Sequence, residues 1–166
     1  MNISYTFGIV DFLNYGHIQI LKKAKENGNL NIFGLINQKE AEKWYGNLVS
    51  NFKERQEVLK GIKYIDEIII QDEINPSNSL LKLHEKYKNS KITIYCDKKF
   101  ANMISEEILD IIAGKVEIVD YYEKLSPENI SKEYLKVQKN EIISTKANTL
   151  LALREKLKFS KIEDIY

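Results

Sequence analysis

The stretch GIVDFLNYGHIQILKKAKENGNLNIFGLI, residues 8–36, decides the fold. It begins inside an apolar segment, 5–12, which is rich in β-forming residues and typical of a buried strand. After a short polar turn, apolar residues recur at helical spacing over 18–24, and Gly28 stands where a glycine commonly ends a helix. A second apolar run, 30–36, predicts another buried strand. Strand, helix and strand with short links predict a parallel α/β unit.

The alternation of strands and helices continues along the chain. Asn51 and Glu54 have the spacing of a capping box and predict a helix with one apolar face. Further strands are predicted at 66–71, 92–96 and 116–119, with helices near 79–87 and 99–113. We therefore predict an α/β fold, a Rossmann-like doubly wound parallel five-stranded sheet with helices on both faces. In such sheets ligands bind beyond the carboxyl ends of the strands, where the strand order reverses.

The segment after residue 120 is predicted to be helical. Ser126 has the character of an N-cap, with Pro127 at the first helical position. A last helix is predicted to begin near Ser144 and to run to about Lys158. We expect one domain over residues 1–143. Residues 144–166 are then its final helix or the start of a following domain absent from this chain.

Composition argues against several classes of function. Twenty-five basic and 24 acidic residues give a net charge of +1, which argues against a nucleic acid or a membrane surface bound through bulk charge. No apolar run approaches the roughly 20 residues that cross a bilayer. The single cysteine, Cys96, excludes an intrachain disulfide and, with no signal-peptide pattern, predicts a cytoplasmic protein. No Walker loop, His-Glu-x-x-His or paired-cysteine pattern is present, so we predict no metal site built from protein side chains.

The turn after the first strand is where the sequence best indicates chemistry. Gly16 allows a ligand to approach the backbone closely, and the first turn of the next helix presents N–H groups and the positive end of the helix dipole. His17 lies in that turn, and even a neutral imidazole donates one hydrogen bond to a phosphoryl oxygen. The alternative interpretation is an ordinary helix start with a surface histidine.

In this context the quoted stretch resembles the opening of the cytidylyltransferase-like nucleotidyltransferases, which include enzymes of the glycerol-3-phosphate cytidylyltransferase and phosphopantetheine adenylyltransferase types. The family pattern has an aromatic-Asp pair after the strand and then His/Thr-x-Gly-His at the start of the helix. Asp11, Gly16 and His17 match it, and Asn14 stands where family members carry His or Thr. The resemblance implies that Asp11, Phe12 and Gly16 bind the nucleotide. It also implies that His17 and Asn14 act in catalysis.

The resemblance extends to FKERQEVLKGIKYIDEIII, residues 52–70, where Arg55 takes the place of a family arginine that opens a helix. By its spacing, Arg55 shares a helix face with the apolar residues three, four and seven positions later. A guanidinium on such a face needs an anion, and a triphosphate would supply one. We therefore assign Arg55 to catalysis. The alternative is an ion pair with Glu54 or Asp66.

A third segment, KNEIISTKANTLL at 139–151, resembles the family's late Arg-x-x-x-Ile-Ser-Thr element, which opens the last helix and binds phosphate. The resemblance implies that Ser144 and Thr145 donate hydroxyl and backbone N–H groups, and that Lys139 replaces the arginine. Lys43 lies where the family has a mobile lysine-bearing loop and is assigned to phosphate binding. An ordinary N-cap and a solvated lysine are the alternatives. Residues 144–166 also resemble the start of ATP-binding domains of the phosphoenolpyruvate synthase type.

The function implied by the resemblance is nucleotidyl transfer. A phosphate or phosphonate oxygen of a small substrate would attack the α-phosphorus of CTP or ATP, CTP being favoured, with Mg²⁺ on the triphosphate and pyrophosphate as the leaving group. Family members are often homodimers. The alternative is a degenerate module of a larger fused enzyme that binds a nucleotide or a phosphorylated metabolite without chemistry.

Overall fold

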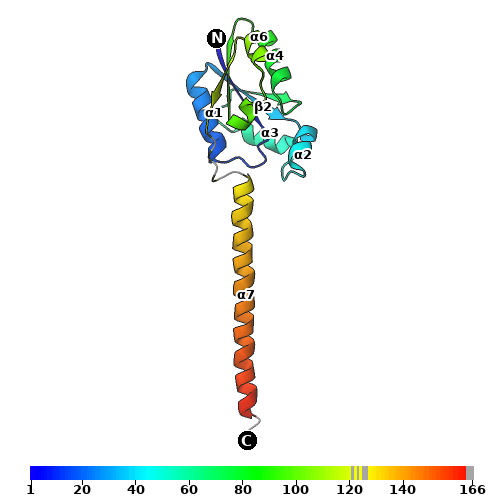
Figure 1. Cartoon of the computed structure of the whole chain (residues 1–166), viewed down its shortest axis with the longest axis vertical. Coiled ribbons are helices and arrows are strands. Elements are labelled where there is room, and N and C mark those ends of the chain that lie inside the picture. The colour runs from blue at the N-terminus through cyan, green and yellow to red at the C-terminus, as the bar shows by residue number, and fades with distance from the viewer. Residues whose placement is uncertain (121, 123, 125–126, 164–166) are drawn as a thin grey trace. The chain divides into compact units, whose positions relative to one another are not determined.

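The computed structural model describes residues 1–120, 122, 124 and 127–163, and Figure 1 traces the chain. The chain divides into two units, residues 1–122 and residues 123–166, which are described separately below. Ser126, the expected N-cap, lies outside the described residues. No helix among the described residues is long and apolar enough to cross a membrane.

The first unit is built on a parallel sheet of five strands in the order β3-β2-β1-β4-β5. The strands are β1 (Asn2–Gly8), β2 (Leu30–Ile36), β3 (Glu67–Gln71), β4 (Lys91–Cys96) and β5 (Lys115–Ile118). The order reverses between β1 and β4, because the chain adds β2 and β3 on one side of β1 and then returns to its other side. The predicted fold class is confirmed, and the carboxyl end of β1 lies at the switch point where such sheets bind ligands.

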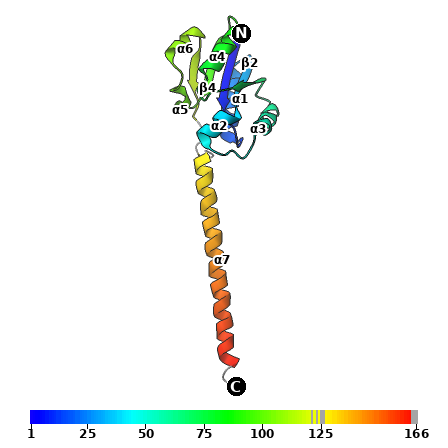
Figure 2. The same ribbon diagram turned by 90° about the vertical axis from the view of Figure 1, so that its right-hand side faces the viewer.

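Helices cover both faces of the sheet. They are α1 (Tyr15–Asn27), α2 (Gln38–Tyr45), α3 (Phe52–Lys60), α4 (Ser77–Lys86), α5 (Lys98–Ala101) and α6 (Glu106–Ile111). Leu21 of α1 and Leu59 of α3 are buried in one cluster with Phe33 and Leu35 of β2. Leu80 of α4 is buried in a second cluster with residues from β1, β2 and β4. Figure 2 shows α3 and α6 on opposite sides of the strands.

Three expectations about elements differ from the structure. β1 ends at Gly8 rather than at residue 12, because Ile9 and Val10 are buried in the turn without belonging to the strand. The polar stretch after β2 forms α2, capped by the Asn37 side chain, which accepts a hydrogen bond from the Glu40 N–H. The single helix expected at 99–113 is two short helices, and Ser105 caps the second.

The second unit holds one helix, α7 (Pro127–Glu163), of 37 residues. Pro127 is its first residue, as predicted. The prediction that a new helix begins at Ser144 is wrong, because Ser144 and Thr145 lie inside α7. No glycine or proline occurs between residues 128 and 163, so the sequence offers nothing that would interrupt the helix there.

Candidate active site

The turn from β1 into α1, residues 9–14, contains a backbone conformation that its sequence disfavours. Val10 has φ 54°, in the left-handed region, where a β-branched residue clashes with its own backbone. Its side chain is 7% exposed and packs with Leu21 of α1 and Phe33 of β2. Such strain persists only where the surroundings hold the backbone in place, and it gathers at functional sites. We call residues 9–14 the elbow.

The side chain of Arg55, on α3, contacts the backbone at the start of this elbow. Its Nη1 donates to the carbonyl oxygens of Ile9, at 2.7 Å, and Ile36, at 3.0 Å, and its Nη2 donates to the Oε1 of Gln38 at 3.1 Å. The guanidinium also lies 5.6 Å from the centre of the Phe52 ring. Arg55 is 1% exposed, and this burial lowers its pKa, while the charge of Asp11 works in the opposite direction.

The Asp11 carboxylate ties the elbow to the connection between α2 and α3. Its two oxygens accept hydrogen bonds from the backbone N–H groups of Val49, at 2.9 Å, and Ser50, at 2.8 Å. The Ser50 hydroxyl donates to the Asp11 carbonyl oxygen at 3.4 Å. Asp11 is therefore a latch between two loops at the end of β1. Its neighbour Phe12 is 58% exposed.

Asn14 and His17 form a capping box at the start of α1. The Asn14 side-chain oxygen accepts from the Gly16 N–H, at 2.9 Å, and from the His17 backbone N–H, while the His17 Nδ1 accepts from the Asn14 N–H at 3.2 Å. The Asn14 carboxamide nitrogen faces back toward the Phe12 carbonyl oxygen, 3.4 Å away. The family's histidine or threonine position is thus used here to cap the helix.

The His17 imidazole is a neutral hydrogen-bond donor. Because Nδ1 accepts a hydrogen bond, the ring proton of the neutral form sits on Nε2. Burial lowers the pKa of His17 to about 4, so the ring is uncharged at neutral pH. An Nε2–H at the first turn of α1 can donate to an anionic oxygen without first losing or gaining a proton.

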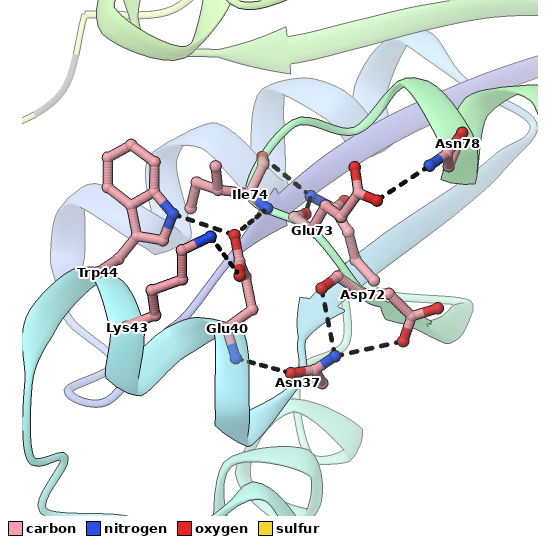
Figure 3. Close-up of polar contacts among 9 residues, drawn as sticks. Asn37, Glu40, Lys43, Trp44, Asp72, Glu73, Ile74 and Asn78 are labelled. Atoms are coloured by element: carbon pink, nitrogen blue, oxygen red, sulfur yellow. Dashed lines mark hydrogen bonds and ion pairs between the residues drawn. The ribbon is translucent and has the colours of Figure 1, made fainter.

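Lys43 lies on α2 in a cluster of polar contacts at the ends of β2 and β3, shown in Figure 3. The Glu40 carboxylate accepts from the Trp44 Nε1 at 3.1 Å and from the Ile74 N–H at 3.2 Å, and it lies 3.4 Å from the Lys43 ammonium. These donors hold the pKa of Glu40 below its usual range, the Ile74 N–H first among them. Lys43 keeps 73% of its side chain exposed.

Glu40, which the sequence alone did not single out, joins α2 to the connection between β3 and α4. The Asn37 carboxamide reinforces that link by donating to the carbonyl and side-chain oxygens of Asp72, both at 3.3 Å. A signal was present, because Asn37 and Glu40 have the spacing of an N-cap and the third helical residue. The mostly polar composition of this stretch hid the helix.

The remaining predicted residues lie in the second unit. Lys139, Ser144 and Thr145 are exposed residues inside α7. The Thr145 carbonyl oxygen accepts from the Thr149 hydroxyl at 2.9 Å. Inside a helix the backbone N–H groups bond to carbonyls four residues earlier, so in this conformation Ser144 and Thr145 have only hydroxyls to offer a phosphate. Their role in binding stays a prediction.

A hollow of about 580 Å³ opens elsewhere on the first unit, and its lining includes Lys23, Lys91 and Lys115. Lys91 and Lys115 begin β4 and β5, so this hollow lies at the amino ends of those strands, away from the elbow. Among the residues that the structure describes, no group of three or more His, Cys, Asp or Glu side chains could hold a metal ion.

The chain is similar to several known proteins. The family model described as cytidylyltransferase-like matches residues 5–149. The chain is 34% identical over 113 residues to FAD synthase from Pyrococcus abyssi, covering 68% of this chain and 74% of that protein. It is 27% identical over 137 residues to bifunctional protein HldE from Geobacter sulfurreducens, covering 81% of this chain but only 27% of HldE.

A solved structure shares the fold. The lipopolysaccharide core biosynthesis protein from Thermoplasma volcanium superposes with a TM-score of 0.55 at 22% identity, over 73% of this chain and 98% of that one. The family match covers most of the chain and includes the elbow, α1 and Arg55. On this ground the chain belongs to the cytidylyltransferase-like family of nucleotidyltransferases.

Proposed function

We propose that this protein transfers a nucleotidyl group, with cytidylyl favoured, from a nucleoside triphosphate to a phosphate or phosphonate oxygen of a small substrate. That oxygen attacks the α-phosphorus, the bond from the α-phosphorus to the bridging oxygen breaks, and pyrophosphate leaves with the electron pair. No covalent intermediate with the protein is needed, so catalysis rests on positioning and on stabilising charge at the phosphoryl oxygens.

The neutral His17 imidazole at the start of α1 is the observation that carries the proposal. Its Nε2–H donates to an α-phosphoryl oxygen, and the positive end of the helix dipole favours the same charge. Asn14 acts by holding the first turn of α1 and the His17 ring in place. Lys43 is proposed to bind the outer phosphates, Asp11 and Gly16 to shape the backbone between β1 and α1, and Phe12, which is 58% exposed, to contact the nucleotide. For the second unit, Lys139, Ser144 and Thr145 are proposed to bind phosphate.

Mg²⁺ is proposed to arrive with the triphosphate. This ion usually keeps several waters and is held by substrate phosphates plus one or two carboxylates, so it needs no cage of protein ligands. Bound Mg²⁺ would neutralise charge on the phosphates as the bond to the leaving pyrophosphate breaks.

Replacement of His17 by alanine tests the proposal. We expect turnover to fall ~10²–10³-fold, because one preorganised donor to the developing charge is lost. Pyrophosphate release is measured with CTP or ATP, Mg²⁺ and a panel of phosphorylated alcohols and phosphonates. ATP with FMN joins the panel because one relative is an FAD synthase. His84→Ala removes an imidazole from α4 and serves as the control. Wild-type turnover in His17→Ala would contradict the proposal.

The second candidate is a binding module without chemistry. Two observations favour it: the Asn14 side chain serves as a helix cap, and the chain spans only 27% of the bifunctional relative HldE. Such a module would be stabilised against heat by CTP or ATP and release no pyrophosphate with any acceptor. Release with one acceptor would exclude it.

A further inference from the structure

The elbow holds a strained residue, and that strain needs a cause. Val10 at φ 54° would relax if its neighbours were free to move, because a left-handed conformation is disfavoured for a β-branched side chain. Packing of its side chain with Leu21 and Phe33 explains where the side chain lies. It does not fix the peptide group on the amino side of Val10, whose oxygen is the Ile9 carbonyl.

Arg55 fixes that peptide group. One guanidinium nitrogen donates to both the Ile9 and the Ile36 carbonyl oxygens, so the side chain joins the ends of β1 and β2. Its other terminal nitrogen donates to Gln38, the first residue of α2. The planar fork of arginine can hold oxygens in several fixed directions at once, which a lysine ammonium on a flexible stem does less well.

Contact between the terminal nitrogens of Arg55 and a triphosphate would compete with these bonds, whereas the buried Nε has no hydrogen-bond partner among the described residues. The side chain is 1% exposed, and its three described oxygen partners are neutral groups at the strand ends. Moving it to a phosphate would leave buried carbonyls unpaired, at a free-energy cost for each. The geometry therefore favours action through the elbow over direct contact with the nucleotide.

We propose that Arg55 is a positioning residue for nucleotidyl transfer. By holding the Ile9 carbonyl it keeps Val10 left-handed, and so aims the elbow that carries Asp11 and leads into the helix bearing His17. This inference rests on the proposed function for its effect on turnover. It differs from the role that the sequence alone suggests for Arg55, which is a direct bond to the phosphates.

Nucleotide affinities separate the two roles. Dissociation constants of CTP and CMP, each with Mg²⁺, are measured for the wild-type protein, Arg55→Lys and Lys53→Met. Lys53→Met removes an exposed cation from the same helix and is the control for bulk charge. We expect the ratio of CTP to CMP affinity in Arg55→Lys to stay within about threefold of wild type, and turnover at saturating substrates to fall about 10-fold or more. A fall of about 10-fold or more in that ratio would show direct contact with the outer phosphates and overturn the proposal.

Glycine at position 10 provides a rescue. Since glycine adopts a left-handed φ without strain, Val10→Gly should keep the elbow in place when Arg55 is weakened. We expect the double variant Val10→Gly with Arg55→Lys to turn over about fivefold or more faster than Arg55→Lys alone. The effect of Val10→Gly in the wild-type background is measured as the reference. If the two substitutions act independently, the proposal is wrong.

Amide hydrogen exchange tests the elbow without any nucleotide. In Arg55→Lys, the amides of residues 10–14 are expected to exchange about 10-fold faster, while those of α4 stay unchanged; general destabilisation would speed both. Equal exchange at the elbow in wild type and variant would overturn the proposal. A wild-type protein that binds neither CTP nor ATP would overturn the proposed function, and the exchange result would still decide whether Arg55 holds the elbow.

Discussion

His17 shows how one partly buried residue links acid stability to the proposed chemistry. Its pKa is about 4 in the folded protein and about 6.5 in the unfolded chain, so the unfolded state binds more protons between these pH values. The stabilisation that neutral His17 contributes should therefore be fully present above pH ~6.5. As the pH drops toward 4, the free energy of unfolding should fall by up to ~3 kcal/mol because of this residue.

Urea unfolding at pH 7, 5.5 and 4 measures that loss. The variant His17→Gln keeps a polar side chain but cannot take up the proton. Its fall in unfolding free energy between pH 7 and 4 should therefore be smaller than that of the wild type by the contribution of His17, up to ~3 kcal/mol. An identical fall in both proteins would show that the imidazole is as exposed to water as in an unfolded chain.

Asp11 provides a second prediction for a single side chain. Asp11→Asn keeps the size but loses one of the two acceptor oxygens that bind Val49 and Ser50. We expect a loss of about 1–3 kcal/mol in unfolding free energy, and faster proteolysis between α2 and α3, where the latch is released. Asp110→Asn, at an exposed carboxylate of α6, is the control. Cleavage at the wild-type rate would mean that the latch contributes nothing in solution.

The roles of the side chains could be predicted from the sequence only in part. The resemblance identified Asp11, Gly16 and His17 as neighbours, and the structure brings all three to the end of β1. It could not show that Asn14 caps α1, because that depends on which way a carboxamide turns. For Arg55, the apolar stripe predicted burial correctly, but spacing cannot tell whether a buried guanidinium meets a phosphate or two strand carbonyls.

Among the elements, β2 depends on a glycine for its fit to the sheet. A Cβ on Gly34 would lie 2.0 Å from the Tyr5 hydroxyl and 2.6 Å from the Gln71 side-chain oxygen, and those two atoms share a buried 2.6 Å hydrogen bond. Gly34→Ala should therefore lower unfolding free energy by about 1–3 kcal/mol through overpacking. Gly61→Ala, where the nearest atom is 3.4 Å away, is the control. Equal stability of the two variants in urea would contradict this account.

Helix boundaries were predicted less well than strands. β2 was predicted to the residue, since a run of apolar residues bounded by polar ones has few alternatives. α2 was missed because its sequence is mostly polar and only Ala41 is buried. The false start at Ser144 arose because serine and threonine are common N-caps but are also tolerated inside helices.

For the whole molecule, the order of elements predicted the parallel sheet because α/β alternation permits few topologies. The division of the chain was not predicted. Contacts separate residues 1–122 from 123–166, and the domain expected over residues 1–143 stays a prediction. Local patterns fix which residues are helical, but contacts between distant segments decide what belongs to a folding unit.

A fragment of residues 1–122 should fold by itself. Every buried residue of the described apolar clusters lies between Ile3 and Val119. Urea unfolding followed by circular dichroism should therefore show one cooperative transition, with an unfolding free energy within about 1–2 kcal/mol of the full chain. The family match reaches residue 149, so pyrophosphate release is measured alongside. A stable fragment without turnover would assign Lys139, Ser144 and Thr145 to the reaction rather than to the fold, and a fragment that fails to fold would show that the core extends into the helix.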